Sequence, residues 1–496
     1  AAQTAAGMPA GEQFVFFSAI AAAPDDPDFV LVAGYDANED AMVAGSDDGG
    51  SNFEIAGDVI PGEELCLAVS PEYDGRREIA AGTKDLTDGG RVWRLQVGGS
   101  WPAYWIDTTT YDGWLDAPAW TANQDVFAIT SLEFSPAFDY DHAIVGVALG
   151  FGFDPSLASA PVSDPIGEGN GFYPAFHYFA GEWNSLDAWN TAADFAAFPS
   201  PLRAGGMLLY GSTYYIAGSW TELFESPVLR MATDIALPYD FTAADPVDMV
   251  ALVSVNGSVV PAQAGLPAGA GGYLFLMQGM APTFELLHQD GNPFISSVAY
   301  HGSIRLMGNA MVGLAFPEIW MADSFDQWPD GVADLDWCGG VTVLYTDRPI
   351  SADLCCPDNW RRAQKPPSGQ FNARVAFTPD GRHAYASTQG YSYVADPWQR
   401  SDESAFSVST DFGACWNQTG LIDTDIDHIA DVVVAGECGD VVIATINYRS
   451  SDPGNDCDSV WRSRDGGDTW LRIWHGALTG DYMEGDEWAV LGVPET

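Results

Sequence analysis

The stretch SRDGGDTW, from Ser463 to Trp470, decides the fold because its pattern recurs along the chain. The same order of serine, aspartate, glycine and a closing aromatic residue stands in SDDGGSNF, Ser46 to Phe53, and in STDFGACW, Ser409 to Trp416. Looser copies, which keep the acid and the aromatic residue, are MADSFDQW at Met321 to Trp328 and ATDIALPY at Ala232 to Tyr239. A turn motif that returns at wide intervals predicts a repeat architecture.

Each position of the motif has a physical role in a tight hairpin. The aspartate can accept hydrogen bonds from the backbone of its own turn, the glycine supplies the backbone angles, and the aromatic residue starts the next strand and packs against a neighbouring sheet. We therefore expect these residues to hold turns and not to catalyse a reaction. They are Ser46, Asp48, Gly50, Phe53, Ser409, Asp411, Gly413, Trp416, Ser463, Asp465, Gly467 and Trp470.

A second repeated unit precedes these turns. It consists of an alternating strand, a Ser/Thr-Pro turn with acids and another apolar strand, in residues 65–83, 132–149 and 374–388. Proline stops the first strand and Asp or Gly reverses the chain, so each unit predicts a β-hairpin. Near the C-terminus, residues 430–448 predict a strand, a turn and a strand, and residues 459–474 predict the outer hairpin; together they supply most of one sheet.

These segments resemble the Asp-box, or BNR repeat, of sialidase-like and sortilin-like β-propellers, in which the box is the hairpin between the third and fourth strands of a blade. The resemblance implies an all-β fold: a single propeller of four-stranded blades over residues 1–496, with seven blades favoured and six or eight possible. It also implies that an N-terminal strand, at about residues 14–20, closes the last blade. Residues 151–201 predict a loop insertion and residues 335–370 a cysteine-containing loop.

The charge balance limits the partners. The 496 residues include 69 Asp and Glu against 19 Lys and Arg, a formal net charge of -50. Such a surface repels nucleic acid and anionic membranes, so we exclude both as partners. The acidity favours an extracellular or cell-surface location, although it can also serve solubility alone. The first residues, AAQTAAGMPAGEQ, are typical of a chain whose secretory signal has been removed.

Cysteine usage agrees with an oxidising compartment. Cys66, within the apolar run LCLAVS, is expected to be a buried free thiol. The other six are candidates for disulfides, whose pairing the sequence does not specify. These are Cys338, Cys355, Cys356, Cys415, Cys438 and Cys457.

Two acidic loops are candidate calcium sites because they gather hard oxygen ligands at short spacing. The first places Asp423, Asp425 and Asp427 at alternate positions. The second gathers Asp452, Asn455, Asp456 and Asp458. Neither matches the EF-hand pattern, so a solvated acidic loop stays the alternative to a Ca²⁺ site. No other cofactor is predicted.

No catalytic set is readable in the sequence. Sialidases of the resembled group bind the substrate carboxylate with three arginines and use a Tyr–Glu pair with an Asp acid/base, but their Arg-Ile-Pro motif is absent here. Two carboxylates suffice for glycoside hydrolysis, yet a chain with 69 acids offers many pairs without singling one out. We therefore predict no catalytic residue.

The function that these features indicate is that of a secreted, non-enzymatic scaffold or binding propeller, such as a surface-layer, sheath or filament subunit. Its expected partners are further copies of itself, other cell-surface proteins or a glycan. The alternative from another class is a secreted glycoside hydrolase with its cleft on the central face of the ring. A third interpretation, an assembly factor for a membrane complex, requires a basic patch that 19 Lys and Arg make hard to build.

Overall fold

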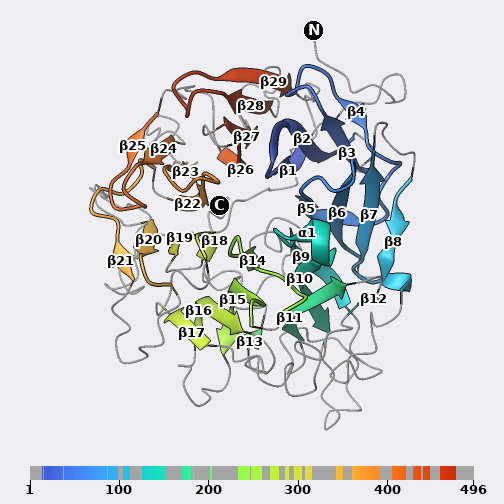
Figure 1. Cartoon of the computed structure of the whole chain (residues 1–496), viewed down its shortest axis with the longest axis horizontal. Helices are drawn as coiled ribbons and strands as arrows, with labels where there is room; N and C mark the ends of the chain where they lie inside the picture. Colours follow the sequence, from blue (N-terminus) through green and yellow to red (C-terminus); the bar gives the residue numbers. More distant parts are fainter. Residues whose placement is uncertain are drawn as a thin grey trace, which may run out of the picture.

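The computed structural model describes residues 14, 16–36, 38, 40–85, 88–98, 104–111, 126–151, 170–179, 182–183, 202–203, 233–245, 247–259, 269–278, 285–289, 295–303, 308–314, 342–349, 360–369, 371–389, 405–419, 428–436, 440–446 and 459–475. The strands of these segments form six hydrogen-bonded sheets arranged in a ring (Figure 1). Four sheets have four strands, one has five and one has eight. The all-β propeller predicted from the sequence is confirmed.

The eight-stranded sheet contains two successive four-stranded meanders, β5–β8 and β9–β12, which a single bridge between Lys84 and Ala128 joins. The ring therefore holds six sheets, or seven meanders if this sheet is divided at its bridge. Both counts lie within the predicted range.

The first three meanders take up the N-terminal part of the chain. Their strands are β1 (Phe16–Ala23), β2 (Asp26–Tyr35), β3 (Ala41–Ser46) and β4 (Glu54–Ile55), then β5 (Glu63–Val69), β6 (Arg77–Lys84), β7 (Val92–Val97) and β8 (Ile106–Asp107), then β9 (Val126–Phe134), β10 (Ile144–Phe151), β11 (Asn170–Phe179) and β12 (Glu182–Trp183). The short helical turns are η1 (Thr108–Thr110) and α1 (Phe138–Asp141).

The remaining meanders complete the ring. Their strands are β14 (Thr233–Ala236), β15 (Val250–Val259), β16 (Gly269–Gln278) and β17 (Glu285–Gln289), then β18 (Ile295–His301), β19 (Asn309–Leu314), β20 (Val343–Thr346) and β21 (Arg361–Arg362), then β22 (Phe371–Phe377), β23 (Ala384–Gln389), β24 (Ala405–Ser409) and β25 (Asn417–Gln418), then β26 (His428–Ala435), β27 (Asp440–Ile446), β28 (Ser459–Ser463) and β29 (Leu471–His475). The additional strand β13 (Leu202–Arg203) pairs with the end of β15. No helix in these described segments is long and apolar enough to cross a membrane.

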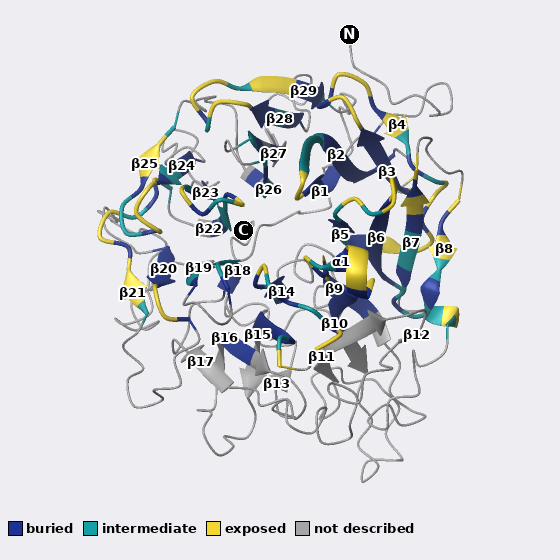
Figure 2. Ribbon diagram, viewed as in Figure 1, coloured by how far each residue is buried: buried dark blue, intermediate teal, exposed yellow. Residues whose placement is uncertain are grey.

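The apolar core is divided into layers between neighbouring meanders. Val43, Ile79 and Leu95 belong to the layer between the first and second meanders, and Met311 and Val375 to the layer between the fifth and sixth. Figure 2 shows buried residues concentrated on the inner strands and exposed residues on outer strands such as β8, β21 and β25. Each sheet thus buries its faces against two neighbours, as expected of a radial repeat.

Six of the seven innermost strands carry a β-bulge, an extra residue that interrupts the pairing with the next strand. In β1 the pairing skips Ser18, in β9 it skips Thr130, and in β18 it skips Ser296. A bulge bends the strand and redirects its side chains. The bulged strands place polar groups where they reach the next meander.

Hydrogen bonds from these inner strands join the meanders around the ring. They are Ser18 Oγ to Glu64 Oε2 at 2.6 Å, the hydroxyls of Thr130 and Thr233 at 2.7 Å, Val298 N to Asp234 Oδ2 at 2.7 Å, Val375 N to Ser297 Oγ at 2.8 Å, Arg374 Nη1 to Asp431 Oδ1 at 3.0 Å, and Ile20 N to Asp431 Oδ2 at 3.3 Å. A weaker contact joins Cys66 Sγ to Ile129 O at 3.5 Å. These polar groups on the inner strands therefore serve ring closure.

The predicted sharing of an N-terminal strand with the last blade is wrong. Strand β1 is the innermost strand of the first meander, and the last meander supplies its own four strands, β26–β29. The reason is local: the turn at Pro24 and Asp25 returns the chain at once, so β1 pairs with β2. The seam between the last and first meanders is instead filled by aromatic rings, with Trp474 stacked at 5.0 Å from Phe14.

The two predicted loops also need correction. Part of residues 151–201 forms β11, which pairs with β10 along its length, and β12. Part of residues 335–370 forms β20 and β21, the outer strands of the fifth meander. Their Pro-, Gly- and Cys-rich surroundings hid strands that pairing with a neighbour stabilises. The rest of both ranges lies largely outside the described residues.

Candidate functional site

Three turns with the same hydrogen bonds join the third and fourth strands of their meanders. In each, the serine hydroxyl donates to the aspartate Oδ1 at 2.9 Å and accepts from the glycine amide, at distances of 2.8 to 2.9 Å. The aspartate then accepts the amide of the residue four positions on, which is Asn52, Cys415 or Thr469. Indole N–H groups of Trp416 and Trp470 close their turns on the preceding glycine carbonyls. These residues fix chain reversals.

These contacts keep the turn aspartates ionised. Hydrogen bonds from Asn52 lower the pKa of Asp48, and those from Thr469 lower the pKa of Asp465. Burial acts to raise the pKa of Asp411, but the amide of Cys415 and the hydroxyl of Ser409 outweigh it and lower the value. Cys415, a predicted disulfide candidate, is a free thiol, and the thiol of Cys66 is partly buried and contacts the carbonyl of Ile129. The other five disulfide candidates lie outside the described residues.

The second turn differs from the other two at the position that follows its aspartate. After its aspartate stands Phe412, with a φ of 60°, where the matching turns have Gly49 and Gly466 at φ 71° and 73°. Glycine adopts this left-handed conformation freely, whereas a bulky side chain is strained in it. Moreover, 45% of Phe412 is exposed to solvent. Backbone strain at an exposed aromatic residue points to a role other than folding.

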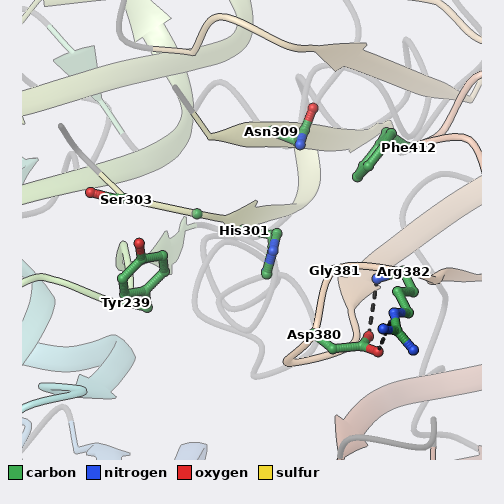
Figure 3. Close-up of a pocket in the computed structure, with 9 residues that line it drawn as sticks. Tyr239, His301, Ser303, Asn309, Asp380, Gly381, Arg382 and Phe412 are labelled. Atoms are coloured by element: carbon green, nitrogen blue, oxygen red, sulfur yellow. Dashed lines mark hydrogen bonds and ion pairs between the residues drawn. The ribbon is translucent and has the colours of Figure 1, made fainter. Parts of the chain in front are cut away.

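Phe412 lines a pocket of about 400 Å³ on the face where the first and second strands of the meanders are joined. Four connections contribute to it: the β14–β15 turn, the β18–β19 connection, the β22–β23 turn and the β24–β25 turn. Its lining residues are Tyr239, His301, Gly302, Ser303, Asn309, Asp380, Gly381, Arg382 and Phe412. Figure 3 shows Tyr239 and Phe412 on either side of His301. The pocket thus spans three neighbouring meanders.

His301 is held in place at the pocket by its neighbours. Its ring centroid lies 5.9 Å from that of Phe377, and a Cβ added to Gly381 would come within 2.2 Å of the imidazole. Only glycine permits this close approach, and Gly381 also has a φ of +66°. Burial lowers the pKa of His301, although the negative charge of Asp380 acts in the opposite direction. At neutral pH the imidazole is therefore uncharged, with one donor and one acceptor nitrogen.

Asp380 is the carboxylate in the lining of this pocket, and its oxygens are already engaged. Thr378 Oγ1 donates to its Oδ1 at 2.7 Å, the amide of Arg382 does so at 3.0 Å, and Arg382 Nε lies 3.4 Å from Oδ2. The amide of Arg382 and the hydroxyl of Thr378 lower the pKa of Asp380. The Arg382 side chain is 81% exposed, so its remaining N–H groups face solvent. Among the lining residues, the negative charge of Asp380 is therefore offset by the positive charge of Arg382.

The remaining wall is built from polar groups with fixed partners. The hydroxyl of Ser303 donates to the carboxylate of Asp240, and the carbonyl of Ser303 accepts from Tyr300 Oη at 3.1 Å. The amide of Tyr239 donates to the carbonyl of Gly302 at 3.2 Å. Because its proton goes to Asp240, the Ser303 hydroxyl is not activated by His301 as a nucleophile would be. The pocket can hold a small polar ligand against aromatic rings.

A second group of ionisable residues, the acids Glu133 and Asp234, lies on the inner strands. Burial raises the pKa of Asp234 to about 6 in spite of hydrogen bonds from the amides of Val298 and Ile235. Glu133 is exposed to solvent, but the protein that surrounds it inside the ring weakens the solvation of its charge. This partial desolvation, together with the negative charge of Asp234, raises the pKa of Glu133 to about 8. Two acids with raised pKa values thus occur on neighbouring inner strands.

The structure brings none of the sequence-predicted site residues into the pocket. The pocket adjoins the second turn through Phe412, which occupies a variable position of the motif. The sequence around His301 has no pattern that marks it as a site residue. The only available signal was phenylalanine in place of glycine in STDFGACW. Tyr239 is the last residue of the looser motif copy at Ala232 to Tyr239. Residues 233–236 of this copy form the innermost strand β14, so the copy is not a turn between a third and a fourth strand. The copy at 321–328 lies outside the described residues.

The calcium candidates are likewise outside the described residues, so the calcium prediction stays a prediction. Within the residues that the structure does describe, no group of three or more His, Cys, Asp or Glu side chains is arranged to hold a metal ion.

No protein-family model and no curated protein matches the sequence. Similar solved structures include YCF48 bound to D1 peptide, with 8% identity and a TM-score of 0.39 over 89% of this chain and 94% of that chain. An α-L-arabinanase of Penicillium chrysogenum complexed with arabinobiose has 8% identity and a TM-score of 0.35, over 78% of this chain and 92% of that chain. The NanB sialidase of Streptococcus pneumoniae has 11% identity and a TM-score of 0.28, over 91% of this chain and 76% of that chain. These neighbours are β-propellers, and the likeness concerns the ring architecture.

Proposed function

We propose that this protein is an extracellular binding propeller without catalytic activity, and that its ligand occupies the pocket lined by His301 and Phe412. The observation that carries the proposal is Phe412 itself. An exposed aromatic side chain is kept in a left-handed conformation where two equivalent turns have glycine. Proteins retain local strain mainly where function requires it.

We also assign the three matching turns to the Asp-box repeat. The support is the shared pattern of serine, aspartate and glycine hydrogen bonds, and the position of each turn between the third and fourth strands of its meander. On this assignment the propeller is a scaffold that presents loops. The ligand is recognised by what the turns carry at their variable positions.

Binding is a better account of this pocket than catalysis. Hydrolysis of a glycoside needs two carboxyl groups with separate roles, one acid and one base or nucleophile. The lining residues contribute one carboxylate, Asp380, which is hydrogen-bonded to Thr378 and Arg382 and has a lowered pKa. A carboxylate in this state can orient a ligand but is a poor proton donor at neutral pH.

The proposal is tested by saturation-transfer NMR on the full chain with a mixed set of small probes: neutral sugars, amino acids and dipeptides. At least one class should bind the wild type and lose binding in Tyr239→Ala and Phe412→Gly. The probe should be recovered unchanged after long incubation. The matched control is Tyr140→Ala, which removes from α1 a 74% exposed aromatic side chain that is not among the residues lining the pocket. If the wild type binds no probe, or if both pocket variants bind as the wild type does, the proposal is wrong.

One observation favours a second candidate, a glycoside hydrolase at the inner strands. A carboxyl group with a pKa near 8, such as that of Glu133, is protonated at neutral pH and can act as a general acid. Asp234, on the neighbouring strand, would be the partner carboxylate. Release of reducing sugar from neutral glucans, abolished by Glu133→Gln and retained by Phe412→Gly, would favour this candidate over the binding pocket.

Self-assembly at a cell surface and calcium-dependent packing are part of the same proposal, supported by the acidic composition alone. Chelation of divalent cations should lower the melting temperature and dissolve any ordered polymer seen in negative stain. A melting temperature that does not respond to chelator would remove calcium from the proposal.

A further inference from the structure

We propose that the ligand of the pocket between Tyr239 and Phe412 is a neutral oligosaccharide. This inference rests on the proposed binding function and adds the chemical class of the ligand. Three properties of the pocket carry it: two exposed aromatic rings, a wall of mixed hydrogen-bond donors and acceptors, and a lining whose one carboxylate, Asp380, is paired with its one guanidinium, Arg382.

The aromatic rings supply the apolar part of the recognition. Tyr239 is 60% exposed and Phe412 is 45% exposed, and the two lie on either side of His301 (Figure 3). The face of an aromatic ring is electron-rich and attracts the polarised C–H groups on one side of a sugar ring. Two such rings at separate places along one pocket suit a ligand with more than one ring. A chain of sugar units meets this requirement, whereas an amino acid does not.

The polar groups that line the pocket match hydroxyl groups. The neutral imidazole of His301 offers one donor and one acceptor, the Asn309 amide offers both kinds, and Arg382 has donors free for a ligand. A hydroxyl group both donates and accepts, so it can pair with any of them. A mixed wall of this kind selects polyhydroxylated ligands over purely apolar ones.

The charges disfavour ionic ligands of either sign. The net charge of -50 opposes the approach of anions such as sialosides or uronates. A cation is attracted over a long range, but the carboxylate that it would meet in the pocket, Asp380, is already paired with Arg382 at 3.4 Å. A cation would have to compete with the Arg382 guanidinium for this carboxylate. A neutral ligand meets no such competition.

The decisive experiment compares four kinds of probe on the full chain by isothermal titration: neutral tetrasaccharides of glucose, mannose and xylose, anionic sialyllactose and tetragalacturonate, a tetralysine peptide and the neutral monosaccharides. A neutral tetrasaccharide should bind more tightly than its monosaccharide and than either anionic sugar. Phe412→Gly and Tyr239→Ala should each weaken it about tenfold, the effect of losing one aromatic contact. Tyr140→Ala should leave it unchanged.

The outcomes separate this inference from the function on which it rests. Binding of tetralysine or of an anionic sugar in preference to neutral sugars, lost in both pocket variants, would overturn the neutral oligosaccharide and leave a binding pocket. Neutral sugar binding that persists in both variants would place the ligand elsewhere and overturn the inference. Circular dichroism and melting temperatures of the variants show that a loss of binding is not a loss of folding.

Discussion

The amide of Ile20 on β1 donates a hydrogen bond of 3.3 Å to Asp431 on β26, across 411 residues of sequence. The other oxygen of this carboxylate accepts from Arg374 Nη1 at 3.0 Å, so that one side chain connects the first, sixth and seventh meanders. A polar contact of this kind does not drive collapse, because water offers equivalent partners to the unfolded chain. It fixes which inner strands become neighbours when the ring closes.

Asp431→Ala should therefore destabilise the ring. The change leaves the guanidinium of Arg374 and the amide of Ile20 unpaired, although the Arg374 and Asp431 side chains are still 23% and 21% exposed. We expect a loss of about 2 kcal/mol in the free energy of unfolding, between the values for exposed and buried pairs. Urea denaturation measures it. The control is Asp347→Ala, which breaks an exposed pair with Arg361 and should cost less than about 0.5 kcal/mol. Equal effects of both variants would argue against a role in closure.

Phe412→Gly should stabilise the fold while it removes the ligand contact. Glycine relieves the left-handed strain of this position, worth about 1 kcal/mol. The reciprocal change, Gly466→Ala, introduces that strain and brings its Cβ within 3.2 Å of Tyr385 Oη, so it should cost about 1 kcal/mol. Differential scanning calorimetry of the two variants should show melting temperatures that move in opposite directions. A lower melting temperature for Phe412→Gly would mean that the side chain serves the fold.

Stability should fall in acid because of the turn aspartates. Asp48 and Asp465 have folded-state pKa values below their ordinary value of 3.8, so they stabilise the fold above this pH. The contribution disappears as the pH falls through the lower folded-state values. In Asp465→Asn, the difference in free energy of unfolding from the wild type should be largest at pH 6 and should shrink below pH 4, as followed by denaturation at several pH values. A difference that does not depend on pH would show that the charge is irrelevant.

Glu133 should have the opposite pH dependence. Its pKa is raised from 4.5 to about 8 in the folded protein, so its ionisation favours the unfolded state. The wild type should lose stability as the pH rises between these two values. Glu133→Gln carries no charge at any pH, so it should be more stable than the wild type at pH 9 and similar at pH 4. A control, Glu54→Gln, changes an exposed acid on β4 and should be similar to the wild type at both pH values.

The sequence predicted the parts of the fold that local chemistry specifies. Ser409, Asp411 and Gly413 satisfy each other within one turn, so the motif carries the whole of their interaction. The hairpins at residues 65–83 and 374–388 were equally visible, because strand and turn residues alternate over a short range. The pairing partner of β1 could not be predicted from the sequence, because the same apolar strand can complete either the first or the last sheet. Only the turn at Pro24 and Asp25 decides between them.

The candidate site was beyond the sequence for a related reason. Tyr239, His301 and Phe412 come from turns of three different meanders, and their proximity follows from the order of sheets around the ring. No spacing rule connects them. Phe412 could have been noticed as an exception to its own motif, but the meaning of the exception depends on its backbone conformation and exposure.

Since β1–β4 and β26–β29 each obtain all their strands from one continuous segment, the ring has no privileged joint. Units of this kind can be duplicated, deleted or reordered at the gene level without rethreading a strand, and the chain can be reopened between any two of them. The same independence leaves the radius of the ring free to change during evolution, one whole module at a time.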